Sequence, residues 1–241
     1  MKSIINYTLT IAITLICFNT GYAQLKKVKG NGNVTTKTHN TSDYYEIDVQ
    51  GFMDVKLESG AEGTITVTTD QNVQEYIIVE AKNGTLTIKV KNKVNIQTKN
   101  GVHITVPFKD LDRISLTGSG DVLTSNVIKS DSFEVELTGS GDVILEVEAT
   151  TIDAKITGSG DLKLKGKTTD LEIKVTGSGD FSGKSLASQN TQAYVSGSGD
   201  AIVFASKSLK ARVNGSGDIN YYGNPESTDT KVMGSGDIGS N

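Results

Sequence analysis

Apolar and polar residues alternate in a pattern that repeats through the second half of the chain. From Leu111 onward the tetrapeptide Gly-Ser-Gly-Asp occurs seven times, with its aspartates 18 to 21 residues apart. Aligning the repeats on the aspartate reveals three apolar positions, which are Ile114, Leu116 and Val122 in the first repeat. The first two lie two residues apart, the spacing that places side chains on one face of a β-strand. The alignment therefore predicts strands with one buried and one solvated face.

A regular period of this length is typical of a solenoid, in which each repeat forms one coil that buries its apolar face against its neighbours. The L-x-x-L-x-L frame of leucine-rich repeats is absent, as is the six-residue subperiod of left-handed hexapeptide helices. The sequence therefore predicts an all-β fold. We expect a single-stranded, right-handed parallel β-helix with coils of about 19 residues over residues 111–241.

The two glycines of each motif are predicted to form structural corners. A corner between strands needs a positive φ or a close approach of two backbones, and glycine supplies both without a Cβ clash. The aspartate is expected to accept hydrogen bonds from free backbone N–H groups of its own corner, as in an Asx turn. The corner glycines are Gly118, Gly120, Gly139, Gly141, Gly158, Gly160, Gly177, Gly179, Gly197, Gly199, Gly215, Gly217, Gly234 and Gly236.

The stacked aspartates raise an electrostatic question. Neighbouring carboxylates at about 4.8 Å would repel by roughly 3–4 kcal/mol at an effective dielectric constant near 20. Calcium between coils is the alternative to backbone amides, but each coil offers one carboxylate where Ca²⁺ takes about 6–8 oxygens. We therefore expect no cofactor, and keep a Ca²⁺ ladder as the alternative. Its ligands would be Asp121, Asp142, Asp161, Asp180, Asp200, Asp218 and Asp237.

The first 110 residues have a different organisation. Residues 1–23 resemble a signal peptide, with Lys2 before a short apolar stretch and Ala23 at the cleavage point. The only cysteine, Cys17, follows Ile16, which argues against a lipoprotein anchor. Residues 24–40 are polar and are predicted to be a flexible lead-in. Residues 41–110 contain short alternating segments and are predicted to form an irregular N-terminal β region.

The charge and the motifs of the chain reduce the number of possible functions. The formal net charge is −4 and no basic run is present, which argues against nucleic acid as a partner. No later stretch reaches the roughly 20 apolar residues of a membrane-spanning helix, so no integral membrane segment is expected after signal cleavage. His39 and His103 have no catalytic companions, and seven equivalent aspartates differ from the unlike groups of a catalytic site. We expect no enzyme activity and no catalytic or cofactor-binding residues.

The segment from Ile104-Thr105-Val106-Pro107 through Ile114-Ser115-Leu116-Thr117 into the first Gly-Ser-Gly-Asp resembles a known family. Together with Val49 to Val55, it is similar to the exported bacterial family named "putative auto-transporter adhesin, head GIN domain", over about residues 41–225. The resemblance implies a right-handed parallel β-helix and an adhesin-like surface role, and it supplies no catalytic residues.

These observations lead to one functional hypothesis and two alternatives. We expect an exported, non-enzymatic surface or envelope binding module whose ligand is a glycan or a protein. Its location would be the periplasm, the outer surface or the extracellular space. The alternatives are a structural, self-assembling homo-oligomer of the envelope and, third, a carbohydrate-active β-helix enzyme.

Overall fold

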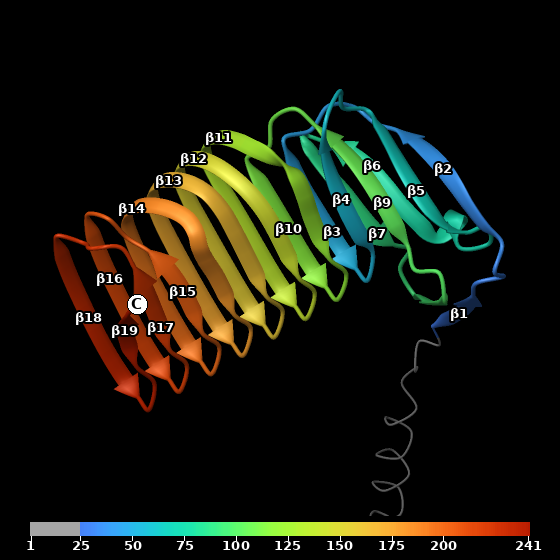
Figure 1. The fold of residues 1–241 in the computed structure, drawn as a ribbon. Coiled ribbons are helices and arrows are strands. Elements are labelled where there is room, and N and C mark those ends of the chain that lie inside the picture. The colour runs from blue at the N-terminus through green and yellow to red at the C-terminus, as the bar shows by residue number, and fades with distance from the viewer. Residues whose placement is uncertain (1–24) are drawn as a thin grey trace, which may run out of the picture.

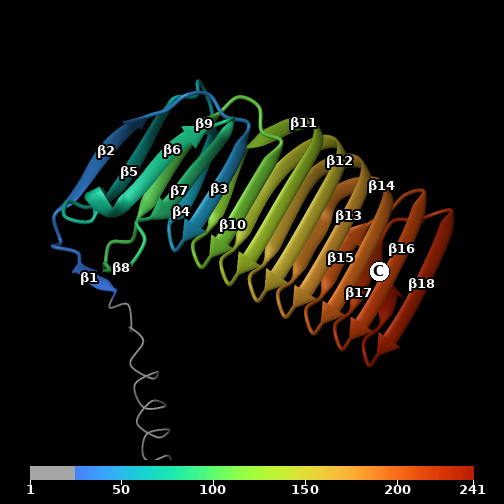
Figure 2. The same ribbon diagram turned by 180° about the vertical axis from the view of Figure 1, so that it is seen from behind.

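Stacked parallel strands form an elongated solenoid, with a less regular β region at one end (Figures 1 and 2). The computed structural model describes residues 25–241. The predicted signal peptide lies outside the described residues. The predicted β-solenoid with a less regular β region before it is confirmed, whereas the handedness of its coils stays a prediction.

Each strand of the solenoid pairs in parallel with the equivalent strand of the next coil. Between β12 and β13, for example, the register runs from Val143↔Leu162 to Gly158↔Gly177. The strands are β10 (Arg113–Gly118), β11 (Val122–Gly139), β12 (Val143–Gly158), β13 (Leu162–Gly177), β14 (Phe181–Gly197), β15 (Ala201–Phe204), β16 (Ser208–Gly215), β17 (Ile219–Tyr222), β18 (Ser227–Gly234) and β19 (Ile238–Ser240).

Strands β11 to β14 are long because each runs from one Gly-Ser-Gly-Asp turn to the next and bends once on the way (Figure 1). We call the bend near the middle of these strands the return corner, and the Gly-Ser-Gly-Asp turn the aspartate corner. Ser130, Ala149, Thr168 and Ser188 occupy equivalent places at the return corner. Each of these coils thus has one turn with the same sequence, Gly-Ser-Gly-Asp, and one bend whose residues differ from coil to coil.

The aligned apolar residues form the core. Ile114, Leu116 and Val122 are fully buried, as are their equivalents in the following coils up to Ile219. The last coil differs: β18 is exposed at every position, and Val232 is 39% exposed. The reason is geometric, because an inward side chain at the end of the stack is covered from one side only.

The N-terminal region already contains a coil of the same stack. Strands β3 (Glu46–Gly51) and β4 (Asp54–Ser59) pair in parallel with β10 and β11, so the sheets continue across residue 110. Strands β7 (Thr85–Val90) and β9 (His103–Phe108) add one further layer. Beyond them the pairing becomes antiparallel, through β5 (Thr64–Asp70) on β9 and β6 (Ile77–Lys82) on β7.

The predicted flexible lead-in is corrected by the structure. β1 (Lys26–Lys29) pairs with β8 (Val94–Gln97), and β2 (Val34–Asn40) pairs antiparallel with β5 along its whole length. β2 is polar because most of its side chains are exposed, and its alternating threonines favour a strand. A short 3₁₀ helix, η1 (Gln74–Tyr76), follows β5.

A buried carboxylate holds the turn that precedes β2. Asp70 is fully buried and accepts hydrogen bonds from the Gly32 N–H at 2.6 Å, the Asn100 side chain at 3.1 Å and the Thr98 hydroxyl. The hydrogen bond from Thr98, followed by those from Gly32 and Asn100, outweighs the effect of burial and lowers the pKa of Asp70. An ionised Asp70 therefore connects the turn at Gly32 with the segment from Thr98 to Asn100, although the two are far apart in the sequence.

The aspartate corners stack too closely to accept a side chain at either glycine. A Cβ on Gly139, whose φ is +129°, would lie 2.0 Å from the carbonyl oxygen of Gly118, and a Cβ on Gly141 would lie 1.9 Å from that of Gly120. Both distances are far inside van der Waals contact, and the atoms met are backbone. The same approach recurs at every corner up to Gly234 and Gly236.

We predict that Gly139→Ala lowers the free energy of unfolding by about 3 kcal/mol or more, or prevents folding, because it adds both a steric clash and an unfavourable φ. Urea unfolding followed by circular dichroism measures the change. Ser140→Ala is the matched control, since Ser140 is exposed in the same corner. Equal stability of the two variants would contradict the close-approach argument.

Candidate functional site

The aspartates of successive corners form a continuous hydrogen-bonded ladder. Oδ1 of Asp121 accepts the main-chain N–H of Asp142 at 2.9 Å, and Oδ1 of Asp142 accepts that of Asp161 at 3.0 Å. The same bond recurs between all later pairs, and the last one joins the N–H of Asp237 to Oδ1 of Asp218 at 2.7 Å. This corrects the expectation that each aspartate would bind amides of its own corner, because the donor belongs to the next coil.

The ladder begins one corner earlier than the sequence motif indicates. Asp54 accepts the N–H of Asp121 at 3.3 Å, and Gly51 before it has φ +135°. The turn Gly51-Phe52-Met53-Asp54 is therefore a degenerate aspartate corner. Its signal was the Gly and Asp three residues apart between apolar strands, which a search for the full motif misses. Met53 stands in place of the second glycine, and its side chain is fully buried.

Main-chain amides are the ligands that the aspartates have in this structure. Nearly all of these side chains remain exposed, so solvent screens their mutual repulsion, as it does for surface charges in general. Among residues 25–241, no three His, Cys, Asp or Glu side chains come together in a way that could hold a metal ion. The ladder thus has a structural explanation that uses only the chain's own atoms.

A shallow groove of about 420 Å³ runs beside the ladder. We call it the corner groove. It is lined by a row of carboxylates, by outward side chains of the strands that follow the corners, and by two almost fully buried core residues: Asp142, Asp161, Asp180 and Asp200; Ile144, Lys163, Ser182, Ile202 and Asn220; and Leu162 and Phe181. Ile144 is 43% exposed. The groove therefore combines a row of carboxylates with a mixed surface that includes exposed apolar atoms.

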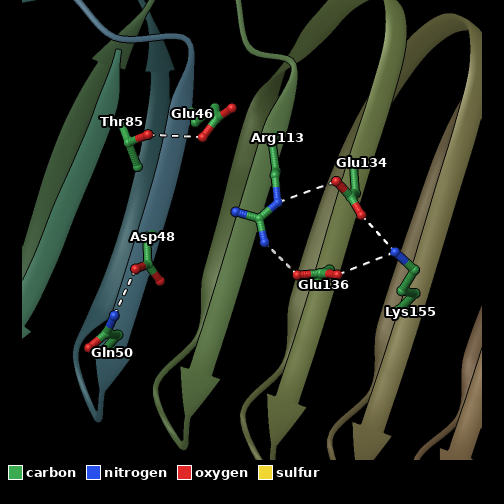
Figure 3. A network of polar contacts seen from close by, with 8 residues as sticks. All are labelled: Glu46, Asp48, Gln50, Thr85, Arg113, Glu134, Glu136 and Lys155. Atoms are coloured by element: carbon green, nitrogen blue, oxygen red, sulfur yellow. Dashed lines mark hydrogen bonds and ion pairs between the residues drawn. The ribbon is translucent and has the colours of Figure 1, made fainter. Parts of the chain in front are cut away.

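The outward-facing side chains of β10, β11 and β12, on the strand segments that lead into the aspartate corners, include charges that are paired with one another (Figure 3). Arg113 lies between Glu134 and Glu136, and Lys155 Nζ contacts Glu134 at 2.7 Å and Glu136 at 3.3 Å. The hydrogen bond to Glu134, helped by the nearby carboxylates and opposed by burial, raises the pKa of Lys155 to about 12. Because each of these four charges has partners of opposite sign, they are better explained as a stabilising network than as a binding site.

The return corners form an open cleft of about 500 Å³ on the opposite side from the aspartate corners. We call it the return-corner cleft. It crosses successive coils from Ser130 on β11 to Phe204 on β15. Thr150, Thr169 and Gln189 lie directly after the register-paired residues of the bend and are exposed or half-buried along the cleft.

The floor of the return-corner cleft is polar but satisfied. The buried Thr168 hydroxyl donates to the carbonyl of Thr150 at 3.0 Å or that of Asp170 at 3.1 Å. Ser188 is buried next to Thr191, whose hydroxyl donates to the Phe204 carbonyl at 2.7 Å. These bonds hold the floor rigid, so the groups free to meet a ligand are those of the rim.

The rim of this cleft contains one ion pair and one aromatic ring. Lys167 Nζ lies 3.4 Å from Glu148 Oε2, and the Lys167 side chain is 68% exposed, so the pair is loose and accessible. Phe204 is half-buried, and its ring packs toward Gly223, where a Cβ would lie 3.3 Å from it. The variable loops between the strands are candidate ligand surface from the sequence alone, but their residues do not align between repeats, so only the structure places them together in one cleft.

The model of the family described as "Putative auto-transporter adhesin, head GIN domain" matches residues 43–225. The chain belongs to this family. The resemblance drawn from the sequence is thereby confirmed. No curated protein matches the chain.

Solved structures from Bacteroides and Parabacteroides species have the same fold. A "putative adhesin" from Bacteroides fragilis has a TM-score of 0.85 at 23% identity, covering 89% of this chain and 100% of its own, which shows the shared fold. A "putative lipid binding protein" from Parabacteroides distasonis has a TM-score of 0.75 at 26% identity, covering 90% of this chain and 100% of its own. A "putative adhesin" from the same species has 0.74 at 27%, with the same coverage.

We predict that Asp142→Ala lowers the free energy of unfolding by about 1 kcal/mol, because it leaves the Asp161 N–H without its acceptor. Asp142→Asn keeps an oxygen at that place and removes one charge from a column of like charges, so it is expected to match or exceed wild-type stability. Urea unfolding measures both, in chelator and in millimolar Ca²⁺. If Asn were as harmful as Ala, the charge itself would be required, which would contradict the amide explanation.

Proposed function

We propose that this protein is an exported, non-enzymatic, adhesin-like binding module of the bacterial envelope or cell surface. The observation that carries the proposal is the return-corner cleft, an open site of about 500 Å³ on a rigid stack of coils. A solenoid suits this task because its strands fix the spacing of surface residues over a long distance while the bends vary. Membership of the adhesin-like family supports the same role.

Three further observations bear on this proposal. The carboxylates of the aspartate corners have equivalent surroundings, whereas acid–base catalysis needs groups with unlike environments. Residues 25–241 contain no helix with the length and hydropathy of a membrane-spanning segment. The family's adhesin-like description is that of surface or exported proteins, which accords with the signal-like residues 1–23.

The proposal predicts that beads coated with residues 24–241 adhere to at least one biological surface. Suitable surfaces are mucin layers, epithelial cell layers and bacterial envelope fractions, with albumin-coated beads as the control. Excess soluble protein should compete for adhesion, and incubation with polysaccharides should release no reducing ends. Adhesion no greater than that of albumin beads on every surface would contradict the proposal.

A second candidate function is lipid binding at the corner groove. It is favoured by the exposed Ile144 and the half-buried Ile202, which line the groove together with the carboxylates. The description of the Parabacteroides distasonis relative as a "putative lipid binding protein" points in the same direction. Since one wall is a row of carboxylates, the amphiphile would have a positively charged head group.

This second candidate predicts that dodecyltrimethylammonium binds below its micelle concentration and that dodecyl sulfate, with the same alkyl chain, does not. Ile144→Lys should abolish the binding by placing a charge in the groove. Leu123→Lys is the matched control, because Leu123 is 39% exposed at the equivalent position one coil earlier and lies outside the groove. Isothermal titration calorimetry makes the comparison. Equal binding of both detergents, or equal loss in both variants, would exclude the groove as the site.

A further inference from the structure

We propose that the return-corner cleft binds a linear, uncharged glycan whose chain runs along the solenoid axis, with about one sugar unit on each coil. The inference rests on the proposed function as a binding module and names the ligand class of its site. It follows from three properties of the cleft: its direction, its repeat distance and the chemistry of its rim.

The direction of the cleft is set by the register of the strands. Ser130, Ala149, Thr168 and Ser188 are paired in sequence through β11, β12, β13 and β14, and the Ser206 N–H continues the row by donating to the Ser188 carbonyl at 3.1 Å. The cleft therefore crosses the strands, and a ligand in it meets one equivalent position per coil. A linear polymer fits such a site better than a compact ligand.

The repeat distance of the site favours a glycan over a peptide. Neighbouring coils are about 4.8 Å apart, whereas an extended peptide rises by about 3.3 Å per residue and would lose register within a few residues. A pyranose unit in an extended chain advances by nearly the same distance as a coil. Each sugar could then present its hydroxyls to the same kind of place, at Thr150, Thr169 and Gln189 in turn.

The chemistry of the rim favours an uncharged ligand. Glu148 and Lys167 carry opposite charges and neutralise each other, so the cleft has no excess charge to attract an ionic polymer. Their loose contact leaves both able to bond with sugar hydroxyls, as acceptor and donor. Phe204 lies at the end of the cleft and is half-buried, with its ring near Gly223. A sugar that reaches this end would pack its C–H face against the exposed part of the ring.

The test is calorimetric titration of residues 24–241 with cello-, malto-, laminari- and chitotetraose. The extended, β-1,4-linked cellotetraose or chitotetraose is expected to bind in the micromolar to millimolar range, and the curved malto- and laminaritetraose are expected to bind more weakly. Phe204→Ala and Glu148→Gln should each weaken that binding by about tenfold or more. Gln189→Ala, at a half-buried surface position, gives a third variant if Phe204→Ala fails to fold.

The chain offers matched controls for the first two variants. Tyr222 is the register partner of Phe204 on the next coil and lies outside the cleft, so Tyr222→Ala should bind normally. Glu146 pairs with Lys165 at 2.7 Å, two residues before the Glu148–Lys167 pair on the same strands, and Glu146→Gln should also bind normally. Thermal melting of each variant separates loss of binding from loss of fold.

Three results would overturn the inference: no binding of any tetrasaccharide, equal loss in the control variants, or binding of charged oligogalacturonate alone. The bead experiment separates this failure from failure of the proposed function. Beads that adhere without competition from neutral tetrasaccharides would leave the binding-module proposal standing and remove the glycan. Beads that adhere to nothing would remove the proposed function itself.

Discussion

The close approach of backbones at the aspartate corners is the constraint on which the rest of the structure depends. Each corner brings a glycine so near to the coil below that a Cβ would lie about 2 Å from a carbonyl oxygen, for example 2.0 Å at Gly139. The same approach puts the N–H of each motif aspartate within hydrogen-bonding distance of the carboxylate below it, as between Asp161 and Asp142. Glycine and aspartate therefore recur together because one permits the contact and the other uses it.

This constraint fixes one edge of the coil and leaves the other free. The strand that leads into each corner keeps an unbroken register from coil to coil, whereas both irregularities, at Leu123/Val127 and Lys163/Lys165, come after a corner. The spacing between aspartates changes from 21 to 18 residues without disturbing the ladder. Differences in length and composition thus collect in the second strand and the return corner, where they alter the surface without affecting the stack.

The repeat predicted the fold well because the motif and its apolar columns are set by a backbone geometry that every coil shares. It predicted less where the geometry is shared but the residues are not. The corner at Gly51 to Asp54 keeps the first glycine and the aspartate only, and the donor to each carboxylate comes from a coil about 19 residues away, beyond any local turn rule. The strand β2 escaped prediction because its pairing with β5, and the buried Asp70 beside it, are tertiary.

The stacking of the coils therefore restricts the residues of the aspartate corner much more than those of the return corner. A residue that is identical in every coil is required by the stacking of the coils. The repeated aspartates first suggest a binding site, but each is explained by the hydrogen bond that it accepts from the next coil. A position such as Gln189 or Phe204 is under no such demand, since its equivalents in neighbouring coils are different residues. Their identities are free to be set by a ligand. In a solenoid of this kind, the departures from the repeat are the better guide to binding, and here they converge on the return-corner cleft.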